Sequence, residues 1–276
     1  MQTIEEKVNN LPSELDPYKE LILSTKKEFV SIGLKKEDNL SFITSKVGGL
    51  GYLPLGAEYP RSKSGDYLAL LAQINFAEMP PLENYPREGI LQFYIADGDS
   101  DYIWGLNLDN LLEGDIKILF HENIEAHQSD FGFLDIFKEE ACLPIDSDIE
   151  LKMNFTLDST IISVVDFRFE KIFKKNFYDL FESFGDKSES LFESYQDLLK
   201  EDLHQVGGYA FFTQEDPRFY VEKNYQDYTE LLFQLDSDDA ENEILWGDVG
   251  IGNFFIRPED LKKKDFSKVL YTWDSH

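Results

Sequence analysis

Four short segments of this sequence recur about 160 residues further along the chain, in the same order. The matched pairs are Val47–Gly49 with Val206–Gly208, Glu58–Arg61 with Glu215–Arg218, Leu70–Asn75 with Leu231–Asp236, and Gly89–Ile95 with Gly250–Ile256. The offset within a pair stays between 157 and 161 residues. A shared order with a nearly constant offset is typical of internal duplication. The sequence therefore predicts two copies of one unit, over about residues 44–97 and 203–258.

Each predicted copy is rich in strands. It contains a Gly-Gly turn, a loop that ends in Glu-x-Pro-Arg, an apolar strand with an interior glutamine, and an aromatic strand that begins at glycine. Similar apolar runs bounded by Gly, Pro and Asp lie between the copies, at Ile116–Phe120, Ile149–Leu157 and Thr160–Phe169. Such runs are typical of β-strands.

Two helical regions are predicted, one at the N-terminus and one between the copies. In residues 1–37, apolar side chains follow helical spacing after a start near Ser13 or Asp16. From Phe177 to Leu203 they follow the spacing of a half-buried helix pair, with a break at Gly185. The order strands, helices, strands favours an α+β fold over a regular βαβ sheet. We therefore predict one β-rich α+β domain over residues 1–276, with two pseudo-symmetric antiparallel sheet units, an N-terminal helix and a helix pair between the repeats.

The charge of the chain restricts its partners. There are 54 acidic and 26 basic residues, which gives a formal net charge of −28. Such a charge repels nucleic-acid phosphates and anionic membranes, because affinity for both depends on Lys and Arg. We expect no nucleic-acid or membrane partner, whereas a basic protein partner is compatible with the charge. The simpler interpretation is that the charge keeps a protein with 23 Phe soluble.

The N-terminal residues and the cysteine content indicate a cytoplasmic protein. Residues Met1–Lys7 lack a basic stretch followed by an apolar one, and no run approaches the roughly 20 apolar residues of a membrane helix. The single Cys142 allows no internal disulfide, which fits a reducing compartment. Its acidic and apolar neighbours favour a buried structural cysteine over a reactive one.

One motif suggests a metal site. Asp97, Asp99 and Asp101 place carboxylates at alternate positions, as the start of a Ca²⁺ loop does. The pattern then fails, because Tyr102 and Leu108 stand where that loop requires Gly and Glu. Solvated turn carboxylates are the favoured interpretation, and a weak divalent-cation site is the alternative.

Other catalytic and cofactor motifs are lacking in the sequence. No His or Cys pair has zinc spacing, and there is no G-x-S-x-G or Walker A sequence. We therefore predict no cofactor and no catalytic residues, and an enzyme is disfavoured.

The repeated polar residues are the candidate ligand contacts. An interior glutamine on an apolar strand must be hydrogen-bonded, so Gln73 and Gln234 are either structural links or ligand contacts. Arg61 and Arg218 could bind carboxylates or phosphates. Internal ion pairs, Glu58 with Arg61 and Glu215 with Arg218, are the favoured interpretation. Asp236, at the end of a matched segment, completes the candidate set.

An ordered set of glycines, prolines and strand segments resembles the bacterial YwqG-like family, the DUF1963 family of unknown function. The residues that carry the resemblance are Gly48-Gly49, Pro54, Gly56, Pro60, Leu70–Glu78, Gly89–Phe93, Gly207–Tyr209 and Leu231–Asp236. The resemblance implies a duplicated, β-rich fold in a bacterial cytoplasmic protein, and it brings no catalytic residues. Relatives of this kind often occur beside toxin and immunity genes, which implies an inhibitory binding role by association.

Two functions are compatible with these observations. The first is a non-enzymatic protein that binds a protein partner, in the manner of an immunity protein that binds a basic toxin. The second is a small-ligand-binding protein or enzyme with its site in a cleft between the two copies. In the second case the cleft is lined by Arg61, Gln73, Arg218, Gln234 and Asp236.

Overall fold

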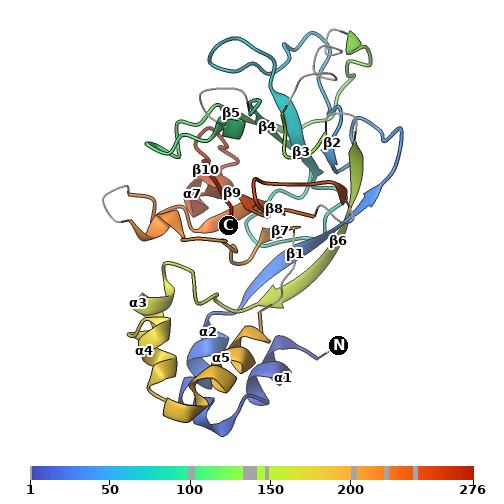
Figure 1. The fold of residues 1–276 in the computed structure, drawn as a ribbon. Coiled ribbons are helices and arrows are strands. Elements are labelled where there is room, and N and C mark those ends of the chain that lie inside the picture. Colours follow the sequence, from blue (N-terminus) through green and yellow to red (C-terminus); the bar gives the residue numbers. More distant parts are fainter. Residues whose placement is uncertain are drawn as a thin grey trace.

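Two long neighbouring strands form the centre of the fold, β1 (Lys27–Lys36) and β6 (Glu150–Thr160). They pair antiparallel from Lys27 opposite Thr160 to Lys36 opposite Leu151. The computed structural model describes residues 2–98, 103–132, 142–146, 149–199, 204–220, 224–238 and 242–276. In this part of the chain the strands form one ten-stranded sheet, in the order β10-β9-β8-β7-β1-β6-β2-β3-β4-β5 (Figure 1).

Four strands lie on each side of this central pair. The first strand group, next to β6, consists of β2 (Lys46–Gly48), β3 (Ala69–Asn75), β4 (Ile90–Ile95) and β5 (Ile116–His121). The second strand group, next to β1, consists of β7 (His204–Gly207), β8 (Glu230–Asp236), β9 (Ile251–Ile256) and β10 (Leu270–Asp274). All of the pairings within these groups are antiparallel. The prediction of a β-rich fold with few helices is confirmed.

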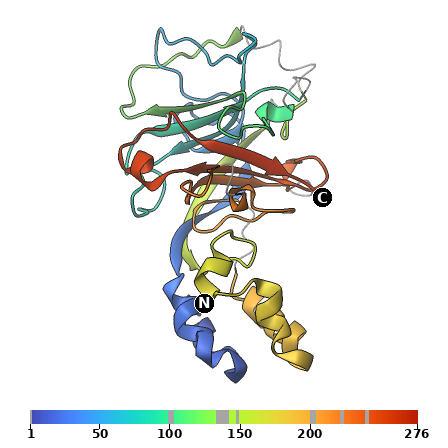
Figure 2. The same cartoon turned by 90° about the vertical axis from the view of Figure 1, so that its left-hand side faces the viewer.

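The sheet curls so that the two strand groups enclose a common core (Figures 1 and 2). The ring of Phe93 on β4 lies 4.9 Å from the ring of Phe233 on β8 and 4.9 Å from that of Phe254 on β9. These side chains belong to one cluster of buried residues from both groups, called the shared core below. Buried side chains of this core therefore lie between the two strand groups.

The helices near the N-terminus and those between the strand groups pack together at one end of the central strands (Figure 2). This helical unit consists of α1 (Ile4–Asn9), η1 (Ser13–Tyr18), α2 (Lys19–Ser24), α3 (Phe169–Phe173), α4 (Phe177–Glu182), η4 (Gly185–Lys187) and α5 (Ser188–Gln196). It has a hydrophobic core of its own. The short elements η2 (Ile103–Gly105), η5 (Pro217–Phe219) and α7 (Pro258–Lys262) lie elsewhere along the chain.

The N-terminal helical region ends earlier than predicted. The prediction of helix up to about residue 37 is wrong beyond Ser24, because residues 27–36 form β1. Val30 is fully buried, opposite Leu157 of β6 on one side and Val206 of β7 on the other. Pairing along both edges of β1 satisfies the hydrogen-bonding groups of its backbone. This tertiary effect outweighs the local preference for a helix that the spacing of the apolar residues indicates. In the predicted helix pair, Gly185 lies between α4 and α5 with a φ of 58°.

The single cysteine lies at the surface. Cys142 is exposed, so the prediction of a buried cysteine is wrong. Its main chain makes the contacts instead: its carbonyl accepts from Gly98 N (2.8 Å) and from Trp104 Nε1 (3.0 Å).

No helix in the described part of the chain is both long and apolar enough to cross a membrane.

Candidate functional site

A cavity of about 340 Å³ lies where the helical unit meets the second strand group. Its walls come from segment 160–165, from Gln196 and Leu199 near the end of α5, from residues 209–211, and from β7 and β8. Side chains alternate along a strand, so Gln234 and Asp236 share the face of β8 opposite Leu235, which belongs to the shared core. The apolar part of the lining includes Ile161, Val164, Val165, Leu199 and Ala210.

Gln234 brings a partly unpaired amide to this cavity. Its side chain is 1% exposed, and its Oε1 accepts a hydrogen bond from Phe211 N at 2.9 Å. Its Nε2 has no hydrogen-bond partner among the described residues.

Asp236 is the carboxylate of the cavity wall. Its Oδ1 accepts from Ser237 N at 2.7 Å. Burial, together with the nearby charges of Asp274 and Asp238, raises the pKa of Asp236 to about 6. At neutral pH this carboxylate is therefore ionised but only weakly stabilised, and a hydrogen-bond donor on a ligand would stabilise it.

The buried side chain of His204 contacts the backbone of Asp236. The Nδ1 of His204 accepts from Asp236 N at 3.2 Å, which places the proton of the neutral ring on Nε2. That nitrogen lies 3.8 Å from Oδ2 of Asp238. Burial lowers the pKa of His204 to about 4, so the ring is neutral at physiological pH.

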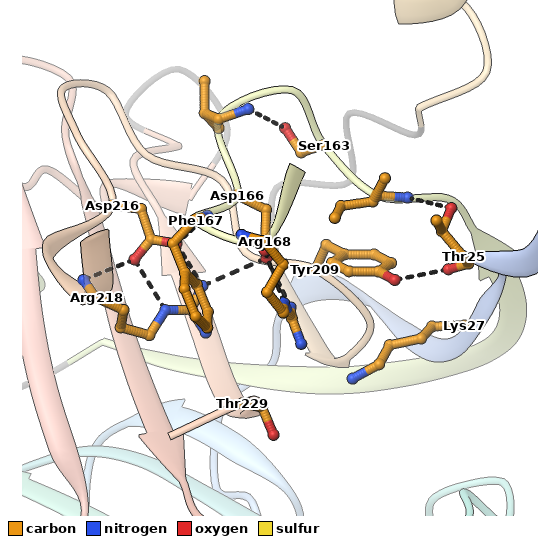
Figure 3. Close-up of polar contacts among 12 residues, drawn as sticks. Thr25, Lys27, Ser163, Asp166, Phe167, Arg168, Tyr209, Asp216, Arg218 and Thr229 are labelled. Carbon is orange, nitrogen blue, oxygen red and sulfur yellow. Dashed lines mark hydrogen bonds and ion pairs between the residues drawn. The ribbon is translucent and has the colours of Figure 1, made fainter. Parts of the chain in front are cut away.

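Four charged residues behind the cavity form a compact ion-pair cluster (Figure 3). Arg218 is 1% exposed and binds the carboxylate of Asp216 through Nε and Nη2, both at 2.8 Å. Arg168 binds Asp166 in the same two-pronged way, at 2.7 Å and 2.7 Å. The two pairs meet where Nη2 of Arg218 lies 3.6 Å from Oδ2 of Asp166. The cluster therefore links the chain just after segment 160–165 to the second strand group.

The electrostatics of the cluster favour its charged form. Burial alone would raise the pKa of Asp166, but the hydrogen bonds and charge of Arg168 and the charge of Arg218 hold it below its ordinary value. Arg218 also donates to Tyr228 O at 3.1 Å, and its guanidinium carbon lies 4.0 Å from the centre of the Phe255 ring. A buried arginine with this many partners is a structural residue and not a free anion receptor.

Tyr209 fixes another wall of the cavity (Figure 3). Its OH donates to Thr25 O at 2.7 Å, and Oγ1 of Thr25 accepts from Ile162 N at 3.1 Å. Burial raises the pKa of Tyr209 to about 12, so its OH is a donor at neutral pH. Three parts of the chain are thus held together around the cavity: the start of β1, segment 160–165 and the loop after β7.

The corresponding amide of the first strand group is fully paired. Gln73 is completely buried, and its Oε1 accepts from Tyr52 N (2.7 Å) and from Gln92 Nε2 (2.8 Å). Its Nε2 donates to Phe42 O (2.8 Å) and to Thr44 O (2.9 Å). Gln73 therefore holds its loops in place and offers no free group.

The second strand group repeats only part of this network. Gln234 faces Asn253 across the strand pair, as Gln73 faces Gln92. Asn253 Nδ2 donates to Phe211 O at 2.9 Å, as Gln92 Nε2 donates to Tyr52 O at 2.7 Å. Phe42 and Thr44, whose carbonyls accept from Gln73 Nε2, correspond at the offset of 159 to residues 201 and 203, which lie outside the described residues.

The two arginines of the repeated Glu-x-Pro-Arg sequences lie in different surroundings. Arg61 is exposed, donates to Gly65 O at 2.7 Å and stacks on Tyr67, 3.8 Å from the ring centre. Among the described residues it forms no ion pair with Glu58. The predicted pairing of Glu215 with Arg218 is wrong, because Asp216, one residue along, is the partner of the buried Arg218.

Of the five predicted ligand contacts, the structure places two in the cavity, Gln234 and Asp236. Arg218 lies in the ion-pair cluster, and Arg61 and Gln73 belong to the first strand group. Sequence reasoning missed Tyr209, although it directly follows the repeated Gly-Gly turn. The prediction of a strand over Thr160–Phe169 is wrong beyond Thr160, where β6 ends, and the part of this segment that lines the cavity has no repeated or motif-like signal.

The predicted metal ligands are only partly described. Asp97 follows the end of β4 by two residues and is half-buried, and its Oδ1 accepts from Cys142 N at 3.0 Å. Asp99 and Asp101 lie outside the described residues. Within the described ranges, no group of three or more His, Cys, Asp or Glu side chains is arranged to hold a metal ion.

These features define a class of β-rich protein in which a curled antiparallel sheet carries a helical unit and a partly apolar cavity lies at their junction. The chain belongs to the DUF1963 family, a domain of unknown function, whose family model matches residues 45–275. The match includes both strand groups and every residue named in the cavity wall, and it begins after α1, α2 and β1. No curated protein matches the chain.

Proposed function

We propose that this protein binds a small, largely apolar molecule in the cavity between the helical unit and the second strand group. The observation that carries the proposal is a cavity of about 340 Å³ whose accessible wall is mainly apolar, although seven of its thirteen described lining residues have polar side chains. This volume is near the lower end of the about 300–1,000 Å³ typical of small-molecule sites. The ion-pair cluster and Tyr209 hold the walls in place, so little ordering is needed on binding.

The side chains around the cavity favour binding over catalysis. Among the described lining residues Asp236 is the carboxylate and Tyr209 is the phenol, and the Tyr209 OH is donated to Thr25 O. No described pair in the lining has a nucleophile within hydrogen-bond distance of a base, which covalent catalysis requires. We therefore propose a non-enzymatic role.

A substitution that fills the cavity tests the proposal. Ser163 lines the cavity, and Ser163→Phe should occupy part of the volume. The matched control is Ser190→Phe, at an exposed position of α5 in the same helical unit. Fluorobenzene is the probe, and line broadening of its ¹⁹F NMR signal is the measurement.

We expect broadening with the unmodified protein and with Ser190→Phe, and little with Ser163→Phe. Equal broadening by all three proteins, or none with any of them, would overturn the proposal. Mass spectrometry of small molecules released when the purified protein is denatured gives an independent measurement. A retained molecule that is lost in Ser163→Phe supports the same conclusion.

The net charge of −28 supports a second candidate function, the binding of a basic protein partner by an acidic, immunity-like protein of the bacterial cytoplasm. Electrostatic attraction would accelerate association and make it depend on salt. A pull-down from native lysate at low and high salt identifies such a partner. If the association rate of that partner is the same at both salt concentrations, the electrostatic mechanism is wrong.

We also propose that the two strand groups descend from one duplicated unit. Supporting this, the strand pairs β3–β4 and β8–β9 shift register at equivalent positions, between Leu70 and Ala72 and between Leu231 and Phe233. The bonds from Gln73 to Tyr52 N and from Gln234 to Phe211 N are also equivalent. An experimental structure in which the two register shifts failed to superpose would contradict a common origin.

A further inference from the structure

A side-chain hydrogen bond of the first strand group is replaced in the second by two acceptors. In the first group, Nε2 of His121 on β5 donates to Oε1 of Gln92 on β4 at 3.0 Å. His121 lies two residues beyond the direct partner of Gln92, so the bond crosses a diagonal of the strand pair. On the same diagonal of β9 and β10, Asn253 and Asp274 take the places of Gln92 and His121. Both side chains are shorter, and an ionised aspartate cannot donate to the amide oxygen.

The amide oxygen of Asn253 is buried without a partner. Asn253 is completely buried, and its Nδ2 donates to Phe211 O at 2.9 Å, which fixes the end of the amide that carries the oxygen. Its Oδ1 is closed off from solvent and accepts no hydrogen bond, and the same holds for Oδ1 of Asp274. Buried acceptors without a partner are rare, so two on one diagonal point to a missing donor or cation.

The loop that follows β7 brings a third unpaired oxygen to this diagonal. It first meets Asn253 through Phe211 O, and three residues later Gln214 N donates to Oδ2 of Asp274 at 2.7 Å. Thr213 lies between these two contacts, and its buried Oγ1 is also unpaired. Burial raises the pKa of Asp274, and the nearby Thr213 hydroxyl lowers it in part, although the two side chains make no hydrogen bond of normal geometry. An amide, a carboxylate and a hydroxyl oxygen therefore gather beneath this loop.

We propose that Asn253 Oδ1, Thr213 Oγ1 and Asp274 Oδ1 bind a hard divalent cation, Ca²⁺ or Mg²⁺. Oxygens of these three kinds are the ligands that such ions prefer. None of the three residues is among the described residues that line the cavity, so the cation site is separate from the proposed small-molecule site. A bound ion would tie the loop after β7 to β9 and β10.

The surrounding charge favours a cation over a buried water molecule. Asp236 and Asp274 both lie opposite Ile251, one on each side, and therefore share one face of the sheet. The charge of Asp274 helps to raise the pKa of Asp236, and neither carboxylate pairs with Lys or Arg in the described part of the chain. A water molecule could donate to two of the oxygens, but a divalent cation can contact all three and also compensate the negative charge.

Isothermal calorimetry with CaCl₂ and, separately, with MgCl₂ tests the proposal. Bound metal is first removed with EDTA, and KCl in the buffer suppresses nonspecific attraction of cations to the net charge of −28. We expect saturable binding of at least one of the two ions at one site per chain. The ion that binds more tightly identifies the occupant.

Two variants and a matched control locate the ion. Asp274→Asn removes the charge of one ligand, and Thr213→Val removes the hydroxyl at nearly the same shape. Each should weaken binding at least about tenfold, because loss of even an indirect contact to a bound metal costs about 10–100-fold in affinity. The control is Asp97→Asn, which lowers the negative charge by the same amount in the other acidic segment and should leave binding unchanged.

Three results would overturn the proposal. The first is no saturable binding of either ion. The second is unchanged binding in Thr213→Val or in Asp274→Asn, each verified as folded by circular dichroism. Thr213→Val decides alone if Asp274→Asn is unfolded. The third is weaker binding in Asp97→Asn, which would place the ion at residues 97–101 or make its binding an effect of net charge.

Discussion

Replacing the equivalent glutamines of the two strand groups should have unequal effects on stability. Gln73 makes four hydrogen bonds, to Tyr52, Gln92, Phe42 and Thr44. Among the described residues Gln234 makes one, with Phe211 N. Methionine has nearly the same shape as glutamine, so Gln73→Met and Gln234→Met differ chiefly in the hydrogen bonds that they remove.

The magnitude follows from the number of bonds. A buried hydrogen bond contributes about 1 kcal/mol net, so the three additional bonds make Gln73→Met about 3 kcal/mol more destabilising than Gln234→Met. For a chain of this size, 1 kcal/mol corresponds to a melting-temperature shift of roughly 2–4 °C, so the two variants should melt roughly 6–12 °C apart.

Urea denaturation followed by far-ultraviolet circular dichroism measures the difference. The denaturation midpoint of Gln73→Met should fall well below that of Gln234→Met, and the slope of the transition should stay the same. Equal destabilisation by the two substitutions would refute the reasoning, since it would mean that Gln234 is as fully paired as Gln73. A change of slope in either variant would indicate altered compactness instead of a lost bond.

Two further predictions concern charged groups. Arg218→Met should lower the free energy of unfolding by about 3–5 kcal/mol, because it leaves the buried carboxylate of Asp216 without its partner and Asp166 with Arg168 alone. Urea denaturation measures this loss, and a loss below about 1 kcal/mol would contradict the prediction. Asp236→Asn tests the raised pKa. The folded protein binds this proton more tightly than the unfolded chain, so Asp236 costs stability that grows as the pH rises from about 4 to about 6. The stability advantage of Asp236→Asn over the unmodified protein should therefore be larger at pH 7.5 than at pH 4, and a difference independent of pH would contradict the shift.

Much of the fold could be predicted from the sequence because local patterns decided it. The apolar runs with interior glutamines became β3 and β8, and the Gly-initiated aromatic runs became β4 and β9. β1 could not be predicted in this way. Its partners β6 and β7 lie more than a hundred residues away in the chain, and the pairing that makes it a strand leaves no local signal.

The candidate site was less predictable, because a repeated sequence segment does not indicate where the folded chain leaves a cavity. Both glutamines are equivalent in sequence, yet only Gln234 faces a cavity, since the helical unit and segment 160–165 lie over the second strand group. The arginine of each Glu-x-Pro-Arg sequence also differs: Arg61 is exposed and Arg218 is buried. A repeated side chain therefore indicates a repeated local structure, and the elements packed around it decide whether it lines a cavity.

During synthesis of the chain, β1 is made well before the two strands with which it pairs. Its partner residues in β6 leave the ribosome over a hundred residues later, on the order of ten seconds at about 5–20 residues per second, and β7 follows later still. During that interval both edges of an apolar strand are open to unwanted pairing. The same geometry applies to a fragment that begins at residue 45, where the family match starts. Such a fragment lacks the strand that joins β6 to β7, so we expect a larger insoluble fraction on expression of residues 45–276 than on expression of residues 1–276.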